Sequence, residues 1–91
     1  MQDTTGAQTH EDGNALAGPL SAVFAHDMTT AVGRCLSCAA ERPLAEVSVW
    51  SHGPGLVARC PGCDAVLLRL VRTPRGSWLD MTGLSRVLLP V

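Results

Sequence analysis

Two Cys-x2-Cys pairs constrain this chain more than any other feature of its sequence. Cys35 and Cys38 form the first pair, Cys60 and Cys63 form the second, and residues 39–59 lie between them. A two-residue spacer lets a tight turn direct both sulfurs at one ion, and two such turns build a four-cysteine site. Four thiolates with no open position suit zinc in a structural role, because a catalytic zinc keeps one position for water or substrate. The sequence therefore predicts one structural zinc ion held by these four cysteines.

The segment between the two pairs predicts a β-hairpin. Residues 43–50 and 56–59 have the character of strands, and the turn-rich residues 51–55 join them. Ala45, Val47 and Val49 form one apolar face of the first strand, which leaves Trp50 on the outward face. A hairpin that leaves one cysteine pair and returns to the other brings the four cysteines together, as in a zinc ribbon.

The N-terminal part of the chain divides at Asn14. Residues 1–13 are polar and predict a disordered tail, whereas residues 14–91 predict a single zinc-ribbon domain. Four apolar residues follow the boundary at helical spacing, and a proline in this segment suits a first helical turn. We expect a short helix over about residues 19–25, with its apolar face formed by Leu16, Leu20, Val23 and Phe24.

The remainder of the chain predicts further strands. Residues 29–34 lead into the first cysteine pair, and residues 66–71 alternate between an apolar face and a mixed one. Residues 73–76 predict a turn, after which residues 77–81 return as an antiparallel partner and residues 84–91 close the chain. The predicted fold class is mainly β: a zinc ribbon extended into a small antiparallel sheet, with a short N-terminal helix.

Two other cysteine chemistries remain to be weighed against zinc. A pair of redox dithiols requires a cysteine pair at the start of a helix within a βαβ pattern, and that context is missing. Iron in a rubredoxin-like site is the nearer competitor, because four thiolates accept either metal. Iron knuckles of that kind carry glycine after the second cysteine, where this chain has Ala39 and Asp64. We favour zinc and keep a rubredoxin-like iron electron-transfer protein as an alternative.

The length and composition indicate that something must supplement the core. The chain has 91 residues, of which 46% are apolar, and a domain this small cannot hide every apolar side chain. Residues 13–26 are the longest stretch without Asp, Glu or Arg, and they are too short to cross a bilayer. No secretory leader opens the chain, so we expect reduced cysteines and no membrane association.

Two kinds of macromolecular partner are compatible with this sequence. The apolar end at residues 87–91 either completes the sheet of this chain or pairs with another subunit or protein through an exposed sheet edge. A nucleic-acid-binding ribbon is the alternative, but the net charge of −1, the 3% aromatic content and the absence of Lys give it little support. The arginines that would form its basic stripe are Arg59, Arg69, Arg72, Arg75 and Arg86.

No sequence pattern in the chain indicates an enzyme. Glycine-rich phosphate loops and nucleophile motifs are absent from the sequence, and the histidines His10, His26 and His52 lack metal-ligand spacing. We therefore predict a non-enzymatic zinc ribbon that acts as a protein-interaction or accessory module. The acidic residues outside any recognisable catalytic motif are Asp27, Glu41, Glu46, Asp64 and Asp80.

Several segments also carry a family resemblance. Residues 12–20 (DGNALAGPL), the first Cys-x2-Cys pair, residues 56–63 (LVARCPGC) and residues 72–74 (RTP) together resemble a family of small actinobacterial zinc-ribbon proteins of unknown function. The resemblance covers roughly residues 12–90. It implies a cytoplasmic protein in which the four cysteines bind the metal, and it supplies no activity.

Overall fold

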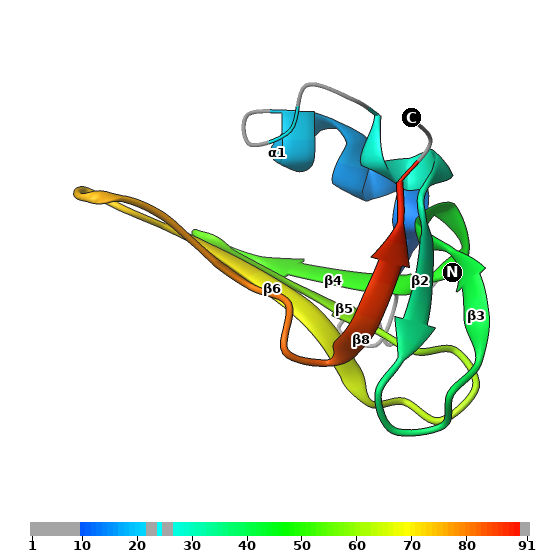
Figure 1. Ribbon diagram of the computed structural model, residues 1–91. Helices are drawn as coiled ribbons and strands as arrows, with labels where there is room; N and C mark the ends of the chain where they lie inside the picture. The colour runs from blue at the N-terminus through cyan, green and yellow to red at the C-terminus, as the bar shows by residue number, and fades with distance from the viewer. Residues whose placement is uncertain (1–9, 22–23, 25–26, 90–91) are drawn as a thin grey trace.

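Two antiparallel β-sheets make up most of the fold, seen in a computed structural model that describes residues 10–21, 24 and 27–89 (Figure 1). Within that part of the chain, the larger sheet has five strands in the order β1, β4, β5, β6, β7, and the smaller has three in the order β3, β2, β8. The elements in chain order are β1 (Glu11–Asp12), η2 (Gly13–Leu16), α1 (Ala17–Ser21), η3 (Met28–Thr30), β2 (Val32–Cys35), β3 (Glu41–Pro43), η4 (Leu44–Glu46), β4 (Ser48–His52), β5 (Gly55–Arg59), β6 (Val66–Thr73), β7 (Gly76–Asp80) and β8 (Leu84–Leu88). The mainly β fold with a short helix near the N-terminus is confirmed.

The strands of the larger sheet bury one face in the core. Alternate side chains of β4, β5 and β6 point to opposite faces, so that Val49, Ala58 and Leu68 are buried while Val57 and Arg69 lie on the other face. The alternation predicted for residues 66–71 is confirmed at Leu68 and Leu70. Leu67 is also buried, and its carbonyl accepts a hydrogen bond from the Gly83 amide in the segment that crosses this end of the sheet.

The predicted strand at residues 43–50 is wrong as a single element. β3 ends at Pro43, the η4 turn follows, and β4 begins at Ser48. The turn buries Leu44 and Val47 on one side, since residues three apart face the same way in a 3-10 helix. It also redirects the chain, so that β3 joins the smaller sheet and β4 joins the larger one.

The N-terminal helical segment covers the buried side of the sheets and begins earlier than expected. The Asp12 side chain accepts a hydrogen bond from the Asn14 amide and caps η2, which continues into α1. Leu16 and Leu20 are buried on this segment, and the Phe24 amide donates to the Leu20 carbonyl as in a further helical turn. Of the helix expected at about residues 19–25, positions 22, 23 and 25 lie outside the described residues.

Residues 11–13 correct the boundary of the predicted tail. Glu11 and Asp12 form β1, which pairs with Val49 and Ser48 of β4. Gly13 is buried, and a Cβ at this position would lie 1.5 Å from the Leu44 carbonyl oxygen. Ordered structure therefore begins before Asn14, and residues 1–9 lie outside the described residues.

The last two strands belong to different sheets. β7 is the antiparallel partner of β6, as predicted, with Trp78 opposite Val71. β8 leaves that sheet and pairs with β2, where Val87 lies opposite Gly33. Among the described residues, no helix is long and apolar enough to cross a membrane. Both sheets and the helical segment contribute to one apolar core, whose buried members are Leu16, Leu20, Met28, Ala31, Cys35, Leu44, Val47, Val49, Leu56, Ala58, Cys60, Leu67, Leu68 and Leu70.

Candidate metal centre

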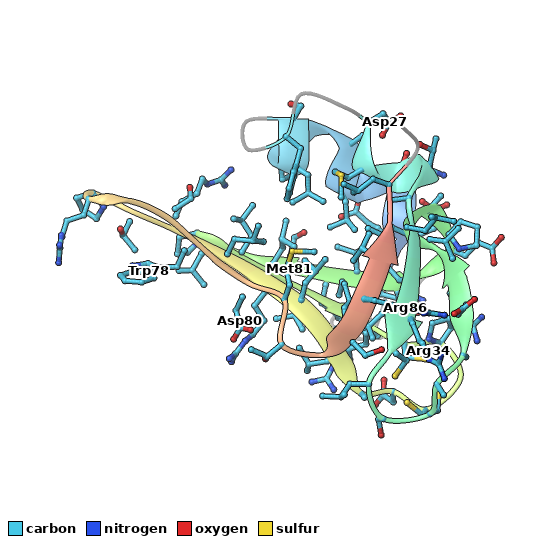
Figure 2. The ribbon with its side chains drawn as sticks, in the orientation of Figure 1. Asp27, Arg34, Trp78, Asp80, Met81 and Arg86 are labelled. Atoms are coloured by element: carbon cyan, nitrogen blue, oxygen red, sulfur yellow. The ribbon has the colours of Figure 1, made fainter. Side chains whose placement is uncertain are left out.

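The two cysteine pairs lie at the ends of two hairpins that belong to different sheets. The first pair connects β2 to β3 in the smaller sheet, and the second connects β5 to β6 in the larger sheet. The predicted β4–β5 hairpin is present between them. The four cysteines nevertheless meet because the ends of the two sheets converge at one corner of the molecule, where Figure 2 shows sulfur atoms close together.

Each cysteine pair has the same backbone geometry. The amides of Cys35 and Cys60 donate to the carbonyls of Ala40 and Ala65, and the amides of Ala39 and Asp64 donate back to the carbonyls of the first cysteines. The strand before each pair also has a register shift immediately ahead of it, at Arg34/Cys35 and at Ala58/Arg59. We call each such turn a knuckle: knuckle 1 is residues 35–40 and knuckle 2 is residues 60–65.

The residue after the second cysteine of each knuckle has a left-handed backbone. Ala39 has a φ of 67° and Asp64 a φ of 66°. Aspartate tolerates this region better than most residues, whereas alanine pays a steric cost of roughly 1 kcal/mol. Both knuckles therefore adopt a turn that favours glycine, although neither has glycine at this position. The absence of glycine here consequently does not distinguish zinc from iron.

The sulfur positions fit one tetrahedral metal ion. The Sγ atoms of Cys35 and Cys63 lie 3.7 Å apart, as do those of Cys38 and Cys60, and all four lie within 4.8 Å of one another. A tetrahedron with metal–sulfur bonds of about 2.3 Å places its sulfurs about 3.8 Å apart. The distances are far longer than the roughly 2.05 Å of a disulfide bond. The four cysteines can thus hold a single metal ion.

The knuckle backbones favour ionised sulfur at the first cysteine of each pair. The amides of Cys38 and Ser37 donate to Cys35 and lower its pKa, against the opposing effect of burial. Burial likewise opposes ionisation of Cys60, but the Cys63 and Gly62 amides lower its pKa to about 7. Because metals bind thiolates rather than thiols, these amides prepare the site for a cation.

The fourth cysteine differs because its neighbours compete for charge. The Ala65 amide lowers the pKa of Cys63, but burial and the three surrounding sulfurs raise it, with a net result of about 11. A bound cation removes this competition by stabilising all four thiolates at once. The protein without metal and the protein with metal therefore differ in the protonation of this site.

Among the described residues, the other sequence candidates do not converge on a second site. The His10 ring lies against Trp50, with centroids 4.6 Å apart, and His26 lies outside the described residues. Three arginines of the predicted basic stripe form ion pairs: Arg59 with Asp64, Arg69 with Asp80 and Arg86 with Glu41. Asp27 accepts hydrogen bonds from the Thr29 amide and hydroxyl.

Two positions beside the metal centre were not found by sequence reasoning. Arg42 projects toward knuckle 2, and Gly83 donates to the Leu67 carbonyl while accepting from the Leu36 amide of knuckle 1. Neither stands in a motif. Gly83 had one available signal, since it is the only glycine after Gly76 and directly precedes the last strand.

Comparison with known proteins identifies the family and no more. No curated protein and no solved structure gave a match. A family model described as a family of unknown function, DUF6510, matches residues 7–91, which include both knuckles and all of the described residues. The chain belongs to this family of unknown function, DUF6510.

Proposed function

We propose that this chain is a non-enzymatic protein-interaction module whose fold is held together by one structural zinc ion. The observation that carries the proposal is the meeting of four cysteine sulfurs at the junction of two sheets. Four protein ligands leave no position for water or substrate, as is typical of structural zinc. A reducing compartment such as the cytoplasm would keep the four thiols available.

Three of the acidic candidates support a non-enzymatic role because arginines engage them. Asp80 pairs with Arg69, Asp64 with Arg59, and Glu41 with Arg86. A groove of about 500 Å³ lies beside the metal centre, but its charged lining residues, Arg69 and Asp80, neutralise one another. No pair of unpartnered acid and base groups lines this groove to promote proton transfer.

An exposed apolar surface on the larger sheet supports a protein partner. Beyond Leu70, β6 and β7 continue as a projecting arm, residues 71–78, and Figure 2 shows Trp78 on it away from the body of the molecule. At the base of the arm, Val71 also pairs with Gly55 of β5, and the Arg72 amide donates to the Pro54 carbonyl. Trp78 is 68% exposed, whereas Trp50 is half-buried beneath the His10 ring and the Arg59 guanidinium. β7 is also an edge strand, which can pair with a strand of a partner.

The charges near this surface favour a protein over a nucleic acid. Arg59 and Arg69 lie on the same face as Val57 but are paired with carboxylates, so they add little net positive charge. Arg72 and Arg75 have no carboxylate partner within the described part of the chain, and two cations are few for phosphate binding. Nucleic-acid binding is therefore the second candidate.

Metal analysis of the purified protein tests the zinc site. We expect one zinc ion per chain, a colourless solution and unfolding when a chelator removes the metal. A red protein containing iron would replace the zinc proposal with the electron-transfer alternative. A fully folded protein that binds no metal would refute the structural role.

Site-specific photo-cross-linking from position 78 tests the interaction surface. A photoreactive amino acid at this position should form a protein adduct, and Trp78→Ser should abolish the same complex. Leu88→Ser is the matched control, because Leu88 is equally exposed but lies on the smaller sheet. Salt-dependent binding of an oligonucleotide, with no protein adduct, would favour the nucleic-acid candidate.

A further inference from the structure

One arginine lies on the core-facing side of the smaller sheet. Arg42 lies directly opposite Gly33 in the β2–β3 pair, and directly opposite residues share a face of a sheet. Gly33 is on the buried face, since a Cβ there would contact the side chains of Leu84 and Leu44. Arg42 is therefore on the core side, whereas its neighbour Glu41 pairs with Arg86 on the outer side.

The Arg42 side chain extends from one sheet to the cysteine turn of the other. Its Nη2 atom lies 3.2 Å from the position that a Cβ would occupy at Gly62, and the Cys60 Sγ lies 3.7 Å from the same point. Gly62 is in knuckle 2, while Arg42 follows knuckle 1 along the chain. The guanidinium consequently rests on the backbone of knuckle 2, beside the sulfur cluster.

Arg42 has no carboxylate to balance its charge. Within the described residues no acidic group lies within ion-pair distance of it, whereas Arg34, Arg59, Arg69 and Arg86 each have one. Its Nε atom is buried and has no hydrogen-bond partner in that same part of the chain. Arg42 as a whole is half-buried, but a buried N–H group without a partner is costly, so the nearest negative charge is expected to matter.

We propose that Arg42 is a positioning residue of the metal centre, which balances the charge of the thiolates from outside the ligand set. The inference rests on the proposed zinc site, because a zinc ion with four thiolates carries a net charge of about −2. Guanidinium N–H groups donate well to anions and keep their charge when buried. Arg42 stabilises the metal-bound state through this charge, and Gly62 provides the space in which the guanidinium lies.

Metal retention in Arg42 variants tests this role. We expect Arg42→Gln to lose zinc to a competing chelator about tenfold more readily than the wild type, the lower end of the range for groups that support metal ligands. Arg42→Lys retains the positive charge and should recover most of the difference. Arg34→Gln is the matched control, because Arg34 lies on the same sheet but on its outer face, and its zinc affinity should not change.

The absorption spectrum of the cobalt-loaded protein gives a readout that a change in packing alone would not alter. The sulfur-to-cobalt absorption bands of Arg42→Gln should shift relative to the wild type, and those of Arg42→Lys should shift back. Gly62→Ala should displace the guanidinium and reproduce part of the Arg42→Gln effect, but it should add nothing in the Arg42→Gln background. Because Gly62→Ala keeps the arginine in the sequence and only moves its guanidinium, it also tests the role if Arg42→Gln fails to fold.

The outcomes separate this inference from the proposed function. Wild-type protein that takes up neither zinc nor cobalt would refute the metal site itself. Wild-type protein that binds metal, with Arg42→Gln and Gly62→Ala matching it in affinity and spectrum, would overturn only the role of Arg42.

Discussion

The two ends of strand β6 have opposite environments. At the metal end, Val66 follows knuckle 2, and Leu68 and Leu70 are buried in the core. At the other end, β6 continues into the arm, where Val71 is 38% exposed and pairs with the more exposed Trp78. Figure 1 shows the same strand running from the crowded corner of the molecule to the projecting tip.

The metal end of β6 stabilises the fold, whereas the arm end is available for binding. The metal end joins two sheets through cysteines and through the backbone hydrogen bonds of Gly83. The arm has no covering layer, and a third strand supports only its base, where Gly55 pairs with Val71. An isolated two-stranded hairpin is only marginally stable. We infer that stability is concentrated at the metal end and that the arm depends on it.

Removing a buried metal ligand should have the largest effect. Cys60 is 1% exposed, so Cys60→Ser removes a thiolate and places a hydroxyl in the core. Structural zinc contributes about 10–16 kcal/mol in small domains, as much as their whole stability. We expect a largely unfolded chain, measured by circular dichroism and by the dispersion of amide NMR signals. Ser37→Ala, an exposed change in knuckle 1, should fold normally, and a folded Cys60→Ser protein without metal would contradict the comparison.

Crowding the crossing beside the metal centre should have the next largest effect. A Cβ at Gly83 would lie 1.8 Å from the Val66 carbonyl oxygen and 2.6 Å from the Leu67 Cα, and backbone cannot move aside cheaply. We expect Gly83→Ala to lower the free energy of unfolding by about 2–3 kcal/mol, measured by denaturant titration. Gly18→Ala, where nothing lies within 4 Å of the added methyl group, is the control and should be neutral or slightly stabilising.

The sequence predicted the parts of this fold that are specified locally. The cysteine spacing, the alternation in residues 66–71 and the β6–β7 turn each depend on neighbouring residues, and the structure contains the corresponding knuckles and strands. The break at Leu44 was not predictable in this way. An apolar stretch that includes Leu44 and Val47 fits a strand, and only the need to bury both residues between two sheets favours the η4 turn.

Longer-range pairing explains the other differences. β1 forms because Glu11 and Asp12 lie beside the edge of β4, and nothing in their polar side chains predicts a strand. The sequence left open whether the C-terminal end completes the sheet of this chain or pairs with a partner, and the turn at Gly83 carries β8 to β2 in a second sheet. The candidate ligands followed from spacing alone, whereas Arg42 became visible only when two sheets brought it onto Gly62.

A change on the arm should leave the fold nearly unaltered. Trp78 is mostly exposed, so Trp78→Ser loses little buried area, and we expect the free energy of unfolding to change by no more than about 0.5 kcal/mol. The same denaturant titration measures it. A loss comparable to that of Gly83→Ala would show that the arm contributes to stability and would remove the contrast between the two ends of β6.

Breaking the ion pair at the base of the arm should have the smallest effect, confined to the titration of Asp80. The Arg69 guanidinium donates to Asp80 with an Nη2–Oδ2 distance of 2.7 Å, and with two hydrogen bonds from Thr82 it lowers the pKa of Asp80 from 3.8 to about 2. A lowered pKa means that the carboxylate contributes stability above about pH 4, and that this contribution is lost as the pH falls toward 2. Carboxyl NMR titration should place the Asp80 midpoint near 2 in the wild type and higher in Arg69→Gln. Asp27 is the internal control: Thr29 lowers its pKa, so its midpoint should not respond to the substitution. An ordinary midpoint for Asp80 in the wild type would mean that the pair does not hold in solution and that the arm is freer at its base than the contacts of β6 and β7 imply.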